Sequence, residues 1–152
     1  MHTLQMNGIK LSEPFACAYQ TFFDDANGGP VHLYRKLAAD RINVAFLHLN
    51  YLDDPKQISC CLPPEKRSHV QHYLKEEHSG HALAVMPAVG LVSIFPHRFD
   101  PAAIGKLMGA LGNEQITFHC MASSTSMLTV VTDAVDQEKT AWAIAGVIHL
   151  PN

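Results

Sequence analysis

Residues 30–48, PVHLYRKLAADRINVAFLH, and residues 101–120, PAAIGKLMGALGNEQITFHC, carry one pattern twice. Each stretch opens with proline, continues as an amphipathic helical segment containing Lys-Leu, and ends in a β-rich run. Apolar residues recur at the spacing of one buried helical face, at Tyr34, Leu37 and Ala38 in the first copy and at Ile104, Leu107, Met108 and Leu111 in the second. The repetition predicts two similar subdomains.

The shared Lys-Leu pair suggests how the two copies align. Lys36-Leu37-Ala38 matches Lys106-Leu107-Met108, and the strands that follow are Val44-Ala45-Phe46 and Ile116-Thr117-Phe118. With this alignment the connection from helix to strand is two residues longer in the second copy. Such a difference is ordinary for a surface loop.

Alternating hydrophobic periods outline the first subdomain. The loop Asp24–Pro30 leads into a helix, because Asn and Gly tolerate positive φ and Pro suits the first helical turn. The predicted β-α-β-β-α-β series is strand Phe15–Phe23, helix Val31–Asp40, strands Ile42–Leu52 and Gln57–Leu62, helix Glu65–Glu77 and strand Ala82–Met86.

The series restarts in the second half of the chain but lacks its final strand. Its predicted elements are strand Val89–Phe95, helix Pro101–Leu111, strands Gln115–Ala122 and Met127–Asp133, and helix Gln137–Val147. The spare strand Leu4–Ile9 is expected to fill the vacant sheet edge. We therefore predict an α+β fold of two ferredoxin-like βαββαβ subdomains, residues 11–87 and 88–152, the second completed by residues 2–10, with antiparallel sheets and helices on one face.

Composition excludes several classes of function. The 152 residues are 47% hydrophobic with a net charge of −3, and the eleven Lys and Arg form no basic stripe. We therefore expect no nucleic-acid partner and no membrane partner. Residues 1–10 lack both a charged and apolar leader and a long apolar run, which predicts a cytoplasmic protein.

The chain offers no catalytic constellation, and we expect a protein that is not an enzyme and has no cofactor. Phosphate-binding glycine motifs are absent, and adjacent His119 and Cys120 should point to opposite faces of a strand. The four cysteines Cys17, Cys60, Cys61 and Cys120 fit buried thiols. A histidine group could hold a metal, or it could simply be solvated: His69, His72, His78 and His81.

These residues resemble tandem ACT domains, especially the regulatory C-terminal region of aspartate kinase. The resemblance covers nearly the whole chain. It rests on Asn27-Gly28-Gly29-Pro30, on residues 37–44 leading into the second strand, and on residues 116–121 followed by Ser123-Ser124-Thr125-Ser126. The serine-rich segment is favoured as an exposed hairpin turn over a ligand contact.

The resemblance implies an amino acid site where a strand-to-helix loop faces the second strand of a neighbouring domain. A glycine-rich loop and a helix N-terminus suit the α-carboxylate, and polar groups nearby suit the α-ammonium. By this resemblance the first-subdomain site consists of Asp24, Asp25, Asn27, Gly28, Gly29 and Val44. The equivalent second-subdomain loop lacks glycine and offers His97, Arg98 and Asp100.

We therefore expect a free-standing regulatory protein that binds a small molecule and signals by ligand-linked association. The resemblance implies that the small molecule is an amino acid. It would form a homodimer through sheet edges or helices and act on a partner enzyme of amino acid metabolism. Ala45 stands where the family often has an acidic residue, so lysine or threonine sensing does not transfer. The alternative is a dimerisation scaffold that binds no ligand, and a plain glycine-rich turn at residues 27–30 would fit it.

Overall fold

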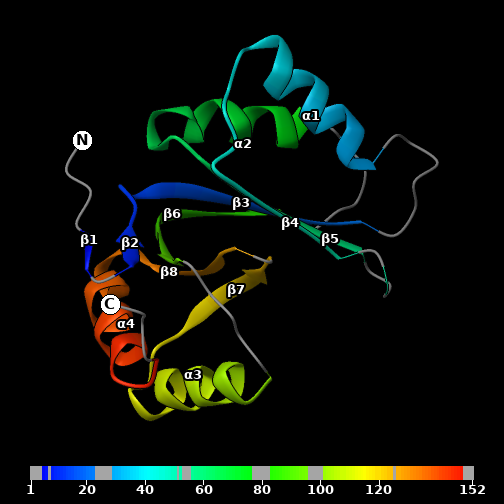
Figure 1. Cartoon of the computed structure of the whole chain (residues 1–152). Coiled ribbons are helices and arrows are strands. Elements are labelled where there is room, and N and C mark those ends of the chain that lie inside the picture. The colour runs from blue at the N-terminus through cyan, green and yellow to red at the C-terminus, as the bar shows by residue number, and fades with distance from the viewer. Residues whose placement is uncertain are drawn as a thin grey trace. The chain divides into compact units, whose positions relative to one another are not determined.

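The computed structural model describes residues 5–6, 8–22, 29–50, 52, 56–76, 83–95, 101–124 and 126–148 (Figure 1). The chain divides into two compact units. Unit 1 combines residues 1–14 with residues 89–152, and unit 2 is residues 15–88. Leu11, which the sequence assigned to the first subdomain, instead ends a strand of unit 1.

Unit 2 is a sheet with the strand order β6-β3-β5-β4, in which β3 and β4 each pair antiparallel with β5. Figure 1 shows both helices of the unit on the same face of this sheet. The elements are β3 (Phe15–Phe22), α1 (Gly29–Ala39), β4 (Phe46–Asn50), β5 (Lys56–Leu62), the 3₁₀ helix η1 (Pro64–Lys66), α2 (Arg67–Glu76) and the first half of β6 (Leu83–Ile94).

The core of unit 2 lies between this sheet and its helices. α1 contributes Leu33 and Leu37, each 2% exposed, and α2 contributes Val70. The sheet contributes Ala18, Cys60 and Leu62. Burial of one face of each helix is what the sequence pattern predicts, except that Ala38 is exposed and Leu33 takes the buried position one turn before Leu37.

Unit 1 repeats the arrangement with the strand order β1-β2-β6-β8-β7. Helices α3 and α4 pack against each other and cover one face of the sheet through a shared apolar core. The elements are β1 (Gln5–Met6), β2 (Ile9–Leu11), the second half of β6, α3 (Pro101–Asn113), β7 (Phe118–Ser123), β8 (Leu128–Asp133), the 3₁₀ helix η2 (Ala134–Asp136) and α4 (Gln137–Ala145).

The N-terminal segment supplies the fourth main strand of unit 1. Ile9 and Leu11 of β2 lie opposite Ile94 and Val92 of β6, and all four side chains belong to the core. The segment is a small hairpin rather than the single strand Leu4–Ile9 that the sequence suggested. Gly8 turns the chain with a φ of 84°, a conformation that glycine adopts without steric cost.

The predicted fold class is confirmed, with antiparallel strand pairs and helices on one face of each sheet. Unit 2 runs β-α-β-β-α-β along the chain, whereas unit 1 runs β-α-β-β-α from β6 onward and β2 from the N-terminus takes the place of the final strand. Several strand predictions need correction. The predicted strand Gln115–Ala122 begins only at Phe118 as β7, because Gln115 has positive φ at the end of α3. The segments Ala82–Met86 and Val89–Phe95 form one strand, β6, because neither Pro87 nor Ala88 interrupts the extended backbone. The predicted strand Ile42–Leu52 is shorter, since Ile42 packs into the core at the end of α1 and β4 begins at Phe46.

Both units stop their first helix in the same way. The Ile42 N–H donates to the Leu37 carbonyl at 2.8 Å, and the Ile116 N–H donates to the Leu111 carbonyl at 2.9 Å. The residue before each isoleucine has positive φ, 53° at Arg41 and 54° at Gln115. These are Schellman motifs in which the buried isoleucine closes the turn.

The shared helix stop corrects the sequence alignment of the two copies. Leu37 is equivalent to Leu111 rather than to Leu107, and Leu33 is equivalent to Leu107. The shared Lys-Leu pair therefore lies one helical turn out of register. In the corrected alignment Phe118 follows Leu111 more closely than Phe46 follows Leu37, so the second connection is the shorter one.

A buried amide ties the N-terminal segment to unit 1. The Gln137 side chain is 8% exposed, and its Nε2 donates to the Ser12 carbonyl at 3.1 Å and to the Leu91 carbonyl at 3.4 Å. Ser12 in turn exchanges hydrogen bonds with the Leu91 backbone. The amide occupies the space where a Cβ on Gly90 would lie, 2.0 Å from Gln137 Cδ.

None of the helices in the described ranges combines the length and apolar character needed to span a bilayer.

The left-handed arginine at the end of α1 gives a first prediction. Arg41→Gly should raise the free energy of unfolding by about 0.5–1 kcal/mol, because glycine removes the strain of positive φ. Urea denaturation followed by circular dichroism measures it. Arg35→Gly, which removes an exposed arginine inside the same helix, should lower stability by about 1 kcal/mol. Equal effects of the two changes would contradict the strained, positive-φ backbone at Arg41.

The packing of Gly90 against Gln137 gives a second prediction. Gly90→Ala should lower the free energy of unfolding by about 1–3 kcal/mol, because the held amide cannot leave without losing its hydrogen bonds. Gly105→Ala is the control, because its Cβ meets open space on a helix and should stabilise by about 0.5–1 kcal/mol. Stabilisation by both alanines in urea titrations would refute the contact.

Candidate functional site

The residues predicted for the first-subdomain site fall around the connection from β3 to α1. Gly29 is the first residue of α1, and Val44 lies just before β4. Asp24, Asp25, Asn27 and Gly28 lie outside the described residues. The second-subdomain residues also lie outside them: His97, Arg98 and Asp100.

The start of α1 has the electrostatic character that the prediction requires. α1 is 11 residues long and has no acidic residue in its first turn. The first N–H groups of a helix have no acceptor within the helix, and the macrodipole makes this end positive. A carboxylate placed here would be stabilised by both effects.

A buried polar side chain that the sequence analysis did not single out lies near the same connection. Gln20 is two residues before the end of β3 and is 6% exposed. It lies opposite Ile58 and shares the helix-facing side of the sheet with Ala18, which belongs to the core. Its Oε1 has no hydrogen-bond partner among the described residues. A buried carbonyl oxygen without a partner can accept a hydrogen bond from a donor group of a ligand.

The signal for Gln20 in the sequence was a glutamine inside the otherwise apolar and aromatic run Phe15–Phe23. Periodicity alone identifies the strand and gives no information about whether one polar side chain finds a partner. That information depends on tertiary packing.

Val44 and β4 have different surroundings. The Val44 side chain is half-buried and packs against the core of unit 2. β4 is the last strand in the order of its sheet, and Leu47 and Leu49 on it are 43% and 46% exposed. An edge strand with two exposed leucines presents both unpaired backbone groups and apolar surface to another chain.

The histidines proposed as metal ligands are used differently. His69 Nε2 lies 2.9 Å from Asp40 Oδ2 and also bonds the Tyr73 hydroxyl, so α2 is linked to the end of α1. Lys36 Nζ lies 5.1 Å from the Tyr73 ring centre. Within the described residues no three His, Cys, Asp or Glu side chains gather as a metal site. His78 and His81 lie outside the described residues.

In unit 1, His119 and the serine-rich segment also have structural partners. His119 Nε2 lies 2.8 Å from Asp133 Oδ1, and a bulge between Phe118 and Cys120 interrupts the regular alternation of the strand. Ser124 closes the β7–β8 hairpin: its N–H donates to the Met127 carbonyl at 2.8 Å, and its Oγ accepts from the Met127 N–H at 3.2 Å. This is the predicted hairpin turn.

A surface groove between α3 and α4 was not predicted. Its lining includes Lys106, Glu114, Gly109 and Val147, and Trp142 at one side is 65% exposed. The sequence signal was an indole within a short helix whose other apolar residues form its buried face.

Comparison with known proteins finds similarity in structure and none in sequence. No protein-family model matches the chain, and no curated protein matches it in sequence. The regulatory subunit of aspartate kinase from Thermus thermophilus, in its ligand-free form, aligns with a TM-score of 0.78 at 17% identity, over 93% of this chain and 97% of that one. The Thermus flavus regulatory subunit aligns with a TM-score of 0.81 at 18% identity and the same coverage.

A larger enzyme contains the same fold as one part. E. coli aspartokinase III in complex with lysine and aspartate aligns with a TM-score of 0.65 at 15% identity, over 93% of this chain and 33% of that chain. These likenesses confirm, at the level of the fold, the resemblance to the regulatory region of aspartate kinase. The two Thermus structures are regulatory subunits rather than catalytic ones.

The unpartnered Gln20 oxygen yields a prediction for the chain without ligand. Gln20→Leu should raise the free energy of unfolding by about 1 kcal/mol, because it removes a buried acceptor that has no donor. Urea denaturation provides the value. Gln57→Leu is the control, since Gln57 is only half-buried and should change stability by less than about 0.5 kcal/mol. A loss of stability in Gln20→Leu would show that the oxygen is satisfied in solution.

Proposed function

We propose that this protein is a regulatory module that binds an amino acid in unit 2 and signals by ligand-linked association. The observation that carries the proposal is the shared fold with regulatory subunits of aspartate kinase, which extends over 93% of this chain and 97% of theirs. A fold shared over nearly the full length of both chains supports a related role, and the residues around the start of α1 supply the specific chemistry.

The site would recognise the two charges common to all amino acids. The N-terminus of α1 offers N–H groups and a positive dipole to the carboxylate, with Gly28 and Gly29 allowing close approach of the backbone. The Gln20 oxygen and the carboxylates of Asp24 and Asp25 would accept from the ammonium group. Gln20 thus gains the hydrogen bond that it lacks in the unliganded protein.

The second-subdomain loop is proposed as a weaker site. His97, Arg98 and Asp100 occupy it in place of the glycines of the first subdomain, and their side chains leave less room for a ligand against the backbone. Arg98 would pair with a carboxylate.

Association would use the free edge of β4. A second copy that pairs with this strand covers Leu47 and Leu49 and brings Val44 and the start of β4 close to the ligand loop of its partner. A ligand held between two copies favours the dimer by its higher affinity for that state. The dimer would then bind or release a partner enzyme of amino acid metabolism in the cytoplasm.

The identity of the effector is open within this class. The E. coli enzyme in the comparison is in complex with lysine and aspartate. This chain has Ala45 directly after Val44, and alanine provides no charge for a basic side chain. A neutral amino acid is the better match to this position.

The second candidate function is an interaction scaffold without a ligand. It is favoured by the exposed Trp142 beside the groove between α3 and α4, since exposed aromatic side chains concentrate at protein interfaces. It predicts no response to any amino acid.

Thermal melting against each of the twenty amino acids tests the proposed function. A ligand that binds only the folded protein at 100 times its Kd should raise Tm by roughly 5–10 °C. We expect a selective shift that Gly28→Val and Gln20→Leu both reduce. Gly112→Val is the matched control, because its Cβ meets open space in unit 1.

Sedimentation velocity on the same samples tests association. The active amino acid should increase the dimer fraction, and Leu47→Lys should lower it without changing the fold. If no amino acid at millimolar concentration changes Tm, the scaffold function is favoured. If an amino acid raises Tm equally in wild type and Gly28→Val, the ligand binds elsewhere.

A further inference from the structure

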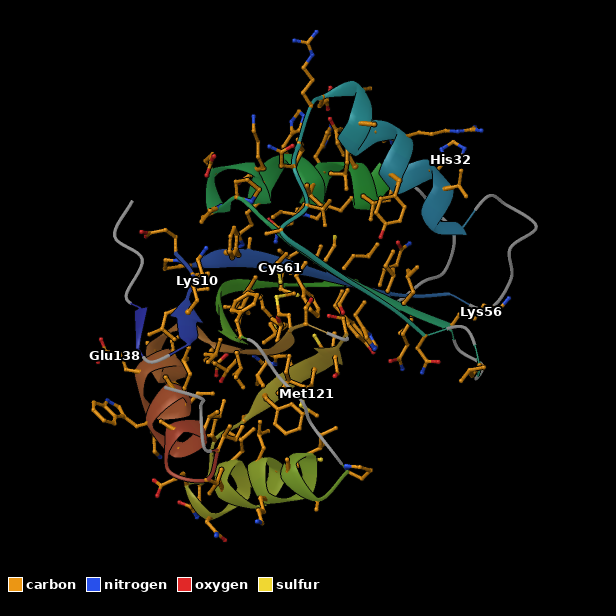
Figure 2. All side chains as sticks on the ribbon, viewed as in Figure 1. Lys10, His32, Lys56, Cys61, Met121 and Glu138 are labelled. Carbon is orange, nitrogen blue, oxygen red and sulfur yellow. The ribbon has the colours of Figure 1, made fainter. Side chains whose placement is uncertain are left out.

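Two cysteines in unit 2 lie directly opposite each other on neighbouring strands. Cys17 on β3 is the register partner of Cys61 on β5, and the two residues are 1% and 0% exposed. Cys61 is labelled in Figure 2. None of the four cysteines takes part in a disulfide in the structure.

The register brings these two side chains to the same face of the sheet. Ala18 and Cys60 form the next register pair and belong to the helix-facing core, so alternation places Cys17 and Cys61 on the other face. Opposite residues of an antiparallel pair have Cα atoms about 4.5 or 5.5 Å apart. Both separations fall inside the range of about 4.4–6.8 Å in which disulfides form.

The thiols of Cys17 and Cys60 have opposite pKa shifts. A hydrogen bond from the Cys61 side chain lowers the pKa of Cys17, although burial opposes the shift. Burial, and then the charge of Cys17, raises the pKa of Cys60 to about 12. Cys17 is therefore the better nucleophile, and Cys60 stays a protonated thiol on the other face.

We propose that Cys17 and Cys61 are a redox-active dithiol that forms a cross-strand disulfide with a low-molecular-weight disulfide such as oxidised glutathione. The Cys17 thiolate attacks one sulfur of the oxidant and releases one glutathione thiolate, which takes up the proton that Cys17 lost. The Cys61 thiolate then attacks the Cys17 sulfur and releases the second glutathione, which takes up the Cys61 proton. Two cysteine thiols are oxidised, and one glutathione disulfide is reduced to two thiols.

The burial of both sulfurs determines when the reaction occurs. An oxidant reaches them only when the packing around them opens locally, so exchange is slower than at an exposed thiol. Once formed, the bond joins β3 to β5 and closes the segment 17–61, which contains α1, β4 and the loop of the proposed ligand site. The formation of the disulfide does not depend on the proposed function. The inference that oxidation holds the ligand site in its folded form does rest on the proposed function.

The test uses the reduced full-length chain in glutathione buffers of increasing oxidised fraction. Samples are quenched in acid, alkylated in denaturant and weighed by intact mass spectrometry. We expect the wild type to lose two of its four alkylation sites without retaining glutathione, and its Tm to rise by about 5–10 °C. Cys60→Ser and Cys120→Ser should each still lose two sites. Cys17→Ser and Cys61→Ser should form no internal disulfide.

Several results would overturn the proposal. They are no thiol loss at a large excess of oxidised glutathione, an internal disulfide in Cys61→Ser, or no internal disulfide in Cys60→Ser. If circular dichroism shows that the serine variants do not fold, Cys17→Ala and Cys61→Ala replace them. Mapping the disulfide-linked peptides of oxidised Cys60→Ser then identifies directly which two cysteines are joined. Amino acid binding by the reduced protein is measured separately, so failure here leaves that result unaffected.

Discussion

The pairing of β2 with the second half of β6 is the constraint on which unit 1 depends. Without β2, the backbone edge of β6 that carries Val92 and Ile94 would have no strand beside it. Ile9 and Leu11 complete that core, and the buried Gln137 amide holds the chain where the strand ends. Gly90 must lack a side chain for this amide to fit. A few residues far apart in sequence thus decide whether the sheet is complete.

The sequence was sufficient for the fold class because each helix and strand has a clear hydrophobic period. The shared Lys-Leu pair led to a wrong alignment of the two copies. The buried leucines are positioned by the left-handed residues that end the helices before Ile42 and Ile116, and not by that dipeptide. Most predicted site residues lie outside the described part of the chain, so they remain predictions. Gln20 and the Cys17–Cys61 pair depend on cross-strand register and tertiary burial, which local patterns do not contain.

Unit 2 combines features that suit a sensor. Its central strands contain an unsatisfied oxygen and two facing thiols, and its edge strand exposes leucines. The oxygen costs stability until a donor reaches it, and the exposed leucines favour association with a second copy. The histidine link between α1 and α2 lies apart from these features, on the outer helices, where it contributes to packing.

The placement of residues 15–88 between the two parts of unit 1 has a consequence for folding during synthesis. β2 is synthesised before unit 2, and its partner residues 92–94 follow only after all of unit 2 has been made. Unit 2 can therefore fold as a continuous segment while β2 stays unpaired, and unit 1 closes after unit 2. A slow step in unit 2 would prolong exposure of the apolar β2 and its open edge, which makes the nascent chain most prone to aggregation in that interval.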